Sequence, residues 1–171
     1  PKAEVASCLQ CHSVATKCDS CHTRHRFSAA EARRPEACVT CHSGPPHPDD
    51  DTYFASAHGK KYRAEAAGQD WNKPLTKGNY SAPTFAYCHM RNGQHQIADK
   101  TIWKFGLQEV NPNTSGNEVR RRAWVDVCSD CHDAEWSAAQ LKGLDRESKS
   151  AWGKLYQAEN IAGAAILGRS D

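Results

Sequence analysis

The sequence predicts a mainly α-helical chain with extensive loops, and three observations support this fold class. Only 39% of the 171 residues are apolar and 8% are aromatic, so side chains alone would fill a small core. Strand-like alternation is nearly absent. The chain also contains nine cysteines and nine histidines, two residue types that bind metals. We therefore expect helices and loops wrapped around cofactors that complete the interior.

Eight of the nine cysteines form four Cys-x-x-Cys pairs, and a histidine directly follows each pair. The pairs are Cys8 with Cys11, Cys18 with Cys21, Cys38 with Cys41 and Cys128 with Cys131, followed by His12, His22, His42 and His132. A zinc knuckle explains the pair spacing but gives no reason for the histidine. Haem attachment explains both, because two thioethers hold the porphyrin while the adjacent imidazole binds its iron. The pattern predicts four haems c, with a zinc-binding module as the weaker alternative.

The ninth cysteine, Cys88, precedes His89 in a motif whose first cysteine position is occupied by Phe85. One interpretation is a buried thiol beside an unrelated histidine. The other is a fifth haem, held by a single thioether at Cys88, with Phe85 packed against the unused vinyl group. We favour the fifth haem because the flanking residues retain a haem-region pattern, described below.

Four histidines remain after five proximal ligands are assigned, and their number nearly matches the five irons. They are His25, His47, His58 and His95. Bis-histidine ligation gives low-potential, six-coordinate haems suited to electron transfer. One iron then lacks a histidine of its own chain. Its sixth position is either open or filled by a histidine from a neighbouring subunit, by the amine of Pro1 or by Met90, and the sequence does not choose among these.

We expect one multihaem cytochrome domain, residues 1–171, organised around a closely packed haem array. Its segments are a three-haem segment (1–50), a region with the single-cysteine attachment (51–110), and the last haem with a C-terminal helix (111–171). In the first half of the chain we expect a turn over 44–51, a helix over 52–67 carrying His58 and a loop over 68–83. In the second half we expect a loop over 111–117 that caps a helix from Glu118 to Val127, and a final helix from an Asp145 N-cap to Ala165.

Charge and hydropathy exclude several classes of protein. The net charge of +2 is spread along the chain, so nucleic-acid binding is not expected. No apolar run reaches transmembrane length, and no signal peptide is present. Since haem attachment occurs outside the cytoplasm, we interpret the sequence as a mature periplasmic or extracellular chain whose signal peptide has been removed.

Three stretches resemble the C-terminal haem region of the octahaem hydroxylamine oxidoreductase family. They are residues 18–27, residues 34–59 with their Cys-Val-Thr-Cys-His and Ser-Ala-His-Gly sequences, and residues 82–103, which include Gly93-Gln-His95 and Trp103. The likeness extends over roughly residues 8–155, and the position of Phe85 is ordinarily a cysteine in that family. The resemblance thereby implies a haem at His89.

The resemblance also implies a candidate active site. The His12 haem would match the family's open catalytic haem, His47 its active-site histidine, and Glu36 an acidic helper. Pro46 replaces the acidic residue that usually precedes that histidine. The family's crosslinking tyrosine falls beyond Asp171, and its three N-terminal haems precede Pro1. We therefore expect reduction or plain electron transfer rather than hydroxylamine oxidation.

Two functions follow from these observations. The first is electron transfer through five haems c, with other redox proteins or copies of the same chain as partners, in a homo-oligomer or an extracellular filament that acts as a wire. The second is a small redox enzyme that acts on nitrite, hydroxylamine or a related species at the His12 haem. The spin state of the irons separates the two functions, because an open catalytic position gives high-spin iron.

Overall fold

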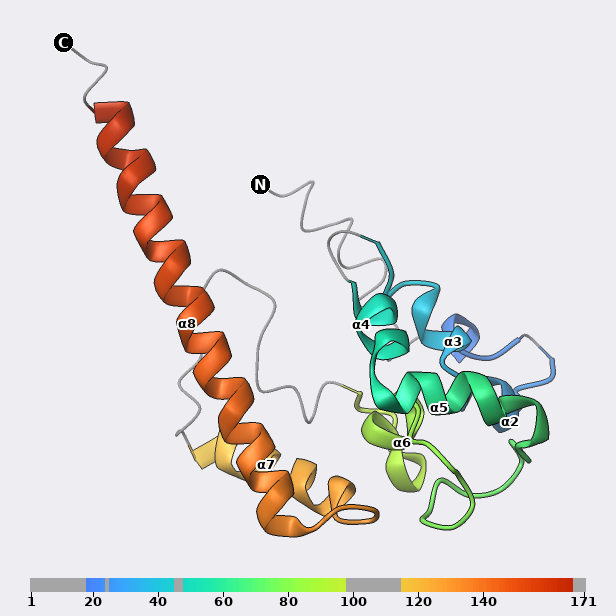
Figure 1. The fold of residues 1–171 in the computed structure, drawn as a ribbon. Coiled ribbons are helices and arrows are strands. Elements are labelled where there is room, and N and C mark those ends of the chain that lie inside the picture. The colour runs from blue at the N-terminus through green and yellow to red at the C-terminus, as the bar shows by residue number, and fades with distance from the viewer. Residues whose placement is uncertain (1–17, 24, 45–47, 98–114, 168–171) are drawn as a thin grey trace. The chain divides into compact units, whose positions relative to one another are not determined.

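The computed structural model describes residues 18–23, 25–44, 48–97 and 115–167 (Figure 1). Its contacts divide the chain into two compact units, Pro1–Asp99 and Lys100–Asp171, and each unit is described by itself below. The single domain with three segments that the sequence suggested stays a prediction.

The first unit consists of short helices joined by turns. Its longest described helix has nine residues. In chain order the helices are η2 (Cys18–Ser20), α2 (Ala29–Ala32), α3 (Glu36–Val39), α4 (Asp49–Ala55), α5 (Ala57–Glu65), η3 (Ala66–Gly68), α6 (Phe85–His89) and η4 (Arg91–Gly93). Isolated helices of this length are marginal in water, so contacts between segments must stabilise them.

Aromatic rings form the interior of the first unit. Ring centroids lie 6.3 Å apart for Tyr53 and Tyr62, 5.7 Å for Tyr62 and Trp71, 5.7 Å for Trp71 and Tyr80, and 6.1 Å for Tyr80 and Tyr87. All of these rings except that of Tyr53 are buried. Such offset or edge-on pairs add stability beyond the area that they bury. The chain of rings joins α4 and α5 to the loop before α6 and to α6 itself.

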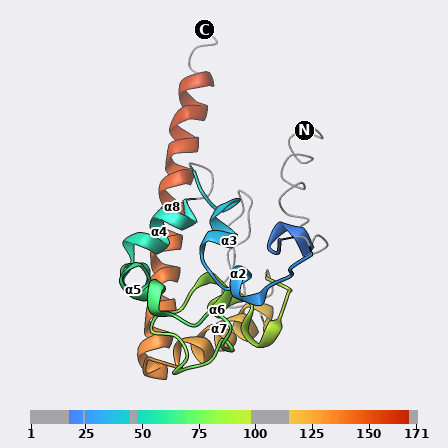
Figure 2. The ribbon, with the colours of Figure 1, turned by 90° about the vertical axis from the view of Figure 1, so that its right-hand side faces the viewer.

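The helix expected over residues 52–67 is wrong in its bounds, because the structure has two helices that meet at Ser56 (Figures 1 and 2). The Ser56 backbone is extended, and its hydroxyl oxygen accepts a hydrogen bond from the Gly59 N–H at 3.1 Å, which caps α5. The helix α4 begins at Asp49, inside the expected turn. The loop over 68–83 is confirmed, since after Gly68 it contains only an isolated bridge between Lys77 and Tyr80.

The second unit is a pair of long helices in its described part. The helix α7 (Ser115–Cys128) packs against α8 (Ala134–Leu167), and Figure 1 shows α8 as one unbroken helix. Arg121 of α7 forms a salt bridge with Asp145 of α8. The helix predicted from Glu118 to Val127 is therefore confirmed within α7.

The predicted start of the last helix at Asp145 is wrong. Asp133 caps α8 instead, since its Oδ1 accepts hydrogen bonds from the Glu135 N–H at 2.8 Å and the Trp136 N–H at 3.0 Å. Asp145 lies in the interior of α8 and is paired with Arg121. Aspartate is typical both of N-caps and of ion pairs, and only the neighbouring helix distinguishes the two roles.

The predicted fold class, mainly α with extensive loops, is confirmed for the described residues. Within these ranges there is no strand. None of the described helices combines the length and the apolar character that crossing a membrane requires. Each of the four described motifs has one cysteine inside a helix, namely Cys18 in η2, Cys38 in α3, Cys88 in α6 and Cys128 in α7.

Candidate functional site

The three described Cys-x-x-Cys-His motifs share one backbone conformation. In each, the first cysteine carbonyl accepts hydrogen bonds from the N–H of the second cysteine and from the N–H of the histidine. The distances to the histidine N–H are 3.0 Å at His22, 3.0 Å at His42 and 2.9 Å at His132. A helical turn places residues three and four apart on one face. Both thiols and the imidazole of each motif can therefore meet a single haem.

The side chains of three predicted proximal histidines are held through Nδ1. The Nδ1 atom of His22 lies 3.1 Å from the Ser28 carbonyl oxygen, and that of His89 lies 3.2 Å from the Ile97 carbonyl oxygen. The Nδ1 atom of His42 lies 2.7 Å from Asp49 Oδ2. A carbonyl oxygen only accepts, so Nδ1 carries the proton and the Nε2 lone pair remains for iron. This is the arrangement typical of metal-binding imidazoles.

The altered motif around Cys88 is also helical, but its Cys88 N–H donates to the Thr84 carbonyl at 3.1 Å. The five residues Phe85–His89 form α6, which begins where the Thr84 hydroxyl oxygen accepts a hydrogen bond from the Tyr87 N–H at 3.3 Å. Thr84 is almost completely buried and donates its hydroxyl proton to the Arg33 carbonyl at 2.8 Å. The Phe85 ring lies 4.7 Å from the Tyr53 ring. Phenylalanine thus occupies the first-cysteine position without distorting the turn.

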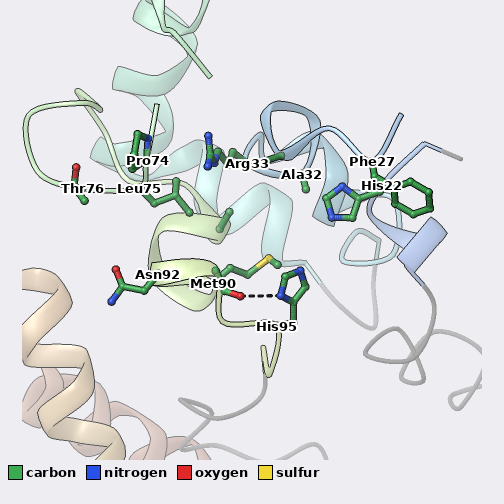
Figure 3. Close-up of a pocket in the computed structure, with 13 residues that line it drawn as sticks. His22, Phe27, Ala32, Arg33, Pro74, Leu75, Thr76, Met90, Asn92 and His95 are labelled. Carbon is green, nitrogen blue, oxygen red and sulfur yellow. Dashed lines mark hydrogen bonds between the residues drawn. The ribbon is translucent and has the colours of Figure 1, made fainter. Parts of the chain in front are cut away.

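A cavity of about 450 Å³ brings two of the predicted iron ligands together in the first unit (Figure 3). His22 and His95 both line it, together with the side chains of Arg33, Leu75 and Met90. His95 Nδ1 lies 2.7 Å from the Gly93 carbonyl oxygen, so Nδ1 donates and Nε2 is the nitrogen available to iron, as at His22. The cavity has an apolar wall and two imidazoles, which fits a haem plane. Its residues therefore fit the cofactor that the motifs imply.

The turn after His22 is strained. Non-glycine residues with positive φ occur at His25 (70°) and Phe27 (45°), and both are exposed. The Phe27 ring lies 6.0 Å from the His22 ring and lines the cavity. Such backbone strain persists only where surrounding contacts impose it. Here it brings an aromatic ring to the edge of the cavity.

The candidate acidic helper Glu36 is engaged by a buried tyrosine. The Tyr62 hydroxyl lies 2.9 Å from Glu36 Oε1 and 2.8 Å from Glu36 Oε2, so it donates its proton to this carboxylate. Burial, the hydrogen bond to Glu36 and the negative charge of Glu36 raise the pKa of Tyr62. Tyr62 therefore remains a donor, and it anchors α5 to the first residue of α3.

The remaining predicted site residues lie either away from the cavity or outside the described part of the chain. His58 lies exposed on α5, and the His132 ring stacks on Trp136 with 4.4 Å between centroids. Neither belongs to the cavity of His22 and His95. The predictions for Cys8, Cys11, His12 and His47 lie outside the described residues.

The described cysteines do not form a zinc site. Burial raises the pKa of the Cys38 thiol to about 11 and also raises the pKa of Cys21 and of Cys128. Among the residues that the structure describes, no group of three or more His, Cys, Asp or Glu side chains could hold a metal ion. The described cysteines form no disulfide with one another.

Asp49 and Thr84 contribute to the site although their sequence positions did not suggest it. Asp49 was grouped with a breaker-rich turn, and Thr84 is the residue before the altered motif. An aspartate seven residues after a ligand histidine carries no recognised spacing signal. A threonine before a helix does carry one, because it is a common N-cap.

Comparison with known proteins gives a family and several relatives. The family model described as seven times multi-haem cytochrome CxxCH matches residues 1–166. A probable nitrite reductase–hydroxylamine oxidoreductase fusion protein of Kuenenia stuttgartiensis is 34% identical over 190 residues, covering 92% of this chain and 22% of that protein. The chain thus spans about a fifth of the length of that relative.

Two solved structures share the fold. A reducing HAO-like protein complex of Kuenenia stuttgartiensis matches with a TM-score of 0.82 and 36% identity, over 95% of this chain and 38% of that one. A hypothetical multiheme protein matches with a TM-score of 0.68 and 20% identity, over 78% of this chain and 41% of that one, which is a likeness of fold alone. The resemblance to the hydroxylamine oxidoreductase family predicted from the sequence is confirmed.

Proposed function

Because the chain belongs to the multihaem cytochrome c family, whose haems are bound covalently through CxxCH motifs, we propose that it transfers electrons through five haems c. Four would be held by two thioethers each and the fifth by Cys88 alone. One observation carries the fifth haem: His89 Nδ1 is held by the Ile97 carbonyl as His22 Nδ1 is held by that of Ser28. This restraint is typical of an imidazole that binds a metal through its other ring nitrogen.

Each bound haem supplies an iron that is reduced and reoxidised by one electron. The residues of the chain hold and shield it. Backbone acceptors fix the planes of the imidazoles of His22 and His89, which limits movement on electron transfer. Apolar side chains such as Leu75 and Ala86 exclude water from the cavity beside His22.

Within this function we assign His95 as the partner of His22, and the two imidazoles would hold the iron of the same haem. Both residues line the same cavity, and the Nδ1 atom of each imidazole is hydrogen-bonded to a backbone carbonyl oxygen. Arg33 lines that cavity too and donates a hydrogen bond to the Trp71 carbonyl at 2.9 Å, so its guanidinium is positioned to meet a propionate. Met90 then serves as cavity wall rather than as ligand.

The proposed partners are other redox proteins or copies of this chain, the latter in an oligomer or filament that acts as a wire. One of the five irons has no spare histidine within the chain, and a neighbouring subunit could supply one. Multihaem c-type cytochromes are usually periplasmic or extracellular, and we propose the same location here.

The name of the fusion protein from Kuenenia stuttgartiensis supports a second candidate function, reduction or oxidation of a nitrogen compound at the His12 haem. His47 would then act as the proton donor. The engagement of Glu36 by the Tyr62 hydroxyl weakens this candidate, since the carboxylate already has a structural role.

A mass and thiol analysis of the purified haem-loaded protein tests the haem count. We expect the mass of five haems and no alkylatable thiol after denaturation, because all nine cysteines would be thioethers. Cys88→Ala should lose one haem, whereas Phe85→Cys should retain five and gain a thioether. Four haems with an alkylatable Cys88 would overturn the single-thioether attachment.

EPR of the ferric protein separates the two functions. Low-spin signals from every iron are expected for an electron carrier. A stable high-spin signal, together with turnover of nitrite or hydroxylamine by the reduced protein, would favour the enzyme. His95→Ala should convert one low-spin signal to high spin while the haem count is unchanged.

A further inference from the structure

The Nδ1 acceptors of the described proximal histidines differ in charge. His22 and His89 face neutral backbone carbonyls at 3.1 and 3.2 Å, whereas His42 faces the Asp49 carboxylate at 2.7 Å. The contact with Asp49 is both the shortest of the three and the only one with a negatively charged acceptor. Charge-assisted hydrogen bonds are shorter and roughly twice as strong as neutral ones.

The fold builds this contact from two directions. The helix α4 begins at Asp49, seven residues after His42, and the Asp50 N–H donates a hydrogen bond to the His42 carbonyl oxygen at 3.3 Å. The first turn of α4 therefore holds the backbone of His42 through Asp50 and its imidazole through Asp49. Carboxylates in the first turn of a helix are also stabilised by the helix dipole.

A carboxylate on Nδ1 changes the electronic character of the ligand. It draws the Nδ1 proton toward itself and raises the basicity of Nε2, which a neutral carbonyl does far less. A more basic imidazole stabilises ferric iron relative to ferrous iron. The acceptor at Nδ1 is therefore a means of adjusting reduction potential without changing the axial ligand.

We propose that Asp49 is a positioning residue that lowers the reduction potential of the haem bound by His42. This inference rests on the proposed function, since it requires a haem at His42. The carbonyl acceptors at His22 and His89 exert no such effect. The chain would then adjust one of its haems through a side chain, a site that a single substitution can change.

Spectroelectrochemical titration of the haem-loaded protein tests the proposal. In Asp49→Asn the acceptor loses its charge but keeps its size. The equilibrium constant for reducing one haem should rise roughly tenfold. For a one-electron couple this raises the midpoint potential of that haem by about 59 mV. Asp51→Asn is the matched control, because it removes the same charge from the same helical turn at an exposed side chain.

The control decides between the hydrogen bond and general electrostatics. Equal shifts in the two variants, or no shift in Asp49→Asn, would overturn the proposal. Asp49→Glu retains the carboxylate and supplies the test if Asn impairs folding. In Asp49→Glu the potential of the His42 haem should stay near the wild-type value if the charge-assisted hydrogen bond sets it. A shift as large as that expected for Asp49→Asn would count against the proposed role of Asp49.

The haem count and EPR spectrum of each variant are measured first. A wild-type protein without haem at His42 would refute the proposed function there. A variant with its full complement of low-spin haems and unchanged potentials would refute only the role of Asp49. The expected result is a full complement, one shifted component, and a change in one low-spin EPR signal of Asp49→Asn.

Discussion

The two units of the chain reach ordered structure by different means. In the first unit, short helices of three to nine residues surround a chain of aromatic rings and carry the described motifs at Cys18, Cys38 and Cys88. In the described part of the second unit, α7 and α8 have 14 and 34 residues and carry one motif. The first unit depends on contacts between distant segments, and the second on hydrogen bonds within its helices.

This difference indicates where the cofactors matter most for folding. A long helix gains one hydrogen bond for each residue added, whereas a helix of one or two turns hardly offsets the cost of its nucleus. The short helices α3 and α6 each contain a cysteine expected to bond to haem. Covalent haem attachment should therefore stabilise the first unit more than the second.

Omission of haem is expected to have the largest effect. Protein made without haem attachment should lose hydrogen-exchange protection in α3, α5 and α6 by about a hundredfold or more, because these helices are short. Protection in α8 should fall by less than about tenfold. Hydrogen exchange followed by mass spectrometry gives both values in one sample. Equal losses in the two units would contradict the proposed difference.

Glycine-to-alanine substitutions test the two units with the same chemical change. A Cβ at Gly59 would lie 2.1 Å from the Tyr53 carbonyl oxygen and 2.6 Å from Phe54 Cα, both backbone atoms of α4. Gly59→Ala should therefore destabilise the protein by about 3 kcal/mol. At Gly153 in α8 nothing lies within 4 Å of an added Cβ. Gly153→Ala should stabilise by about 0.5–1 kcal/mol.

Chemical denaturation monitored by haem absorbance and circular dichroism gives both free-energy changes. The comparison uses the haem-loaded protein, so that the cofactor content of the two variants is the same. A neutral result at Gly59 would show that the corner between α4 and α5 can open without cost. That outcome would contradict the close packing inferred for the first unit.

Much of the fold was predictable where one local signal dominates. The Cys-x-x-Cys-His motifs, the loop over 68–83 and the helix before Cys128 follow from residue type and spacing alone. The break at Ser56 was missed because helical residues continue on both sides of it, and the sharp corner shows only in how closely Gly59 approaches the Tyr53 carbonyl, which leaves no room for a Cβ. Contacts of this kind are tertiary, and periodicity does not record them.

The candidate site divides in the same way. Proximal histidines follow from their position after a cysteine, but their Nδ1 acceptors lie six to eight residues further along the chain, at spacings that carry no recognised signal. His95 and His22 line the same cavity, which residues of η4 and α2 also line, and Asp49 reaches His42 because α4 begins there. The motif spacing predicts haem ligands from the sequence alone, whereas the contact of Asp49 with His42 is visible only in the folded chain.

One ion pair in each unit allows a comparison of stability contributions, with smaller expected effects than the glycine substitutions. The Arg121–Asp145 pair joins α7 to α8, and its side chains are only 18% and 19% exposed. Asp145→Asn should cost about 2 kcal/mol, because it leaves the Arg121 charge largely buried. The Lys61–Glu65 pair on α5 is 50% and 45% exposed, and Lys61→Ala should cost about 0.3 kcal/mol.

Denaturation of each single variant measures these two values. Salt provides a further check, since 1 M salt screens the exposed pair more than the buried one. The stability difference caused by Lys61→Ala should therefore vanish in salt, and that of Asp145→Asn should persist. A salt-sensitive effect at Asp145 would indicate that α7 and α8 are held by other contacts.

The smallest expected effect concerns a polar contact beside the His22 motif. The Glu31 carboxylate accepts hydrogen bonds from the Thr23 hydroxyl and from the Thr23 N–H, the latter at 3.1 Å, and these bonds lower the pKa of Glu31 from its usual 4.5. A lowered pKa in the folded state means that protonation favours unfolding. The stabilisation is present above pH 4.5 and is lost as the pH falls through the lower folded value.

Glu31→Gln removes this titration, so the gap in melting temperature between wild type and variant should narrow as the pH falls below about 4.5. Glu147→Gln on α8 serves as the control for general charge effects, because Glu147 is an exposed residue of the second unit. Thermal melts from pH 7 to pH 3 give the comparison. A melting-temperature difference between wild type and Glu31→Gln that stays constant with pH would mean that backbone hydrogen bonds alone hold the turn after His22. Local polar contacts would then contribute little to the order of the first unit.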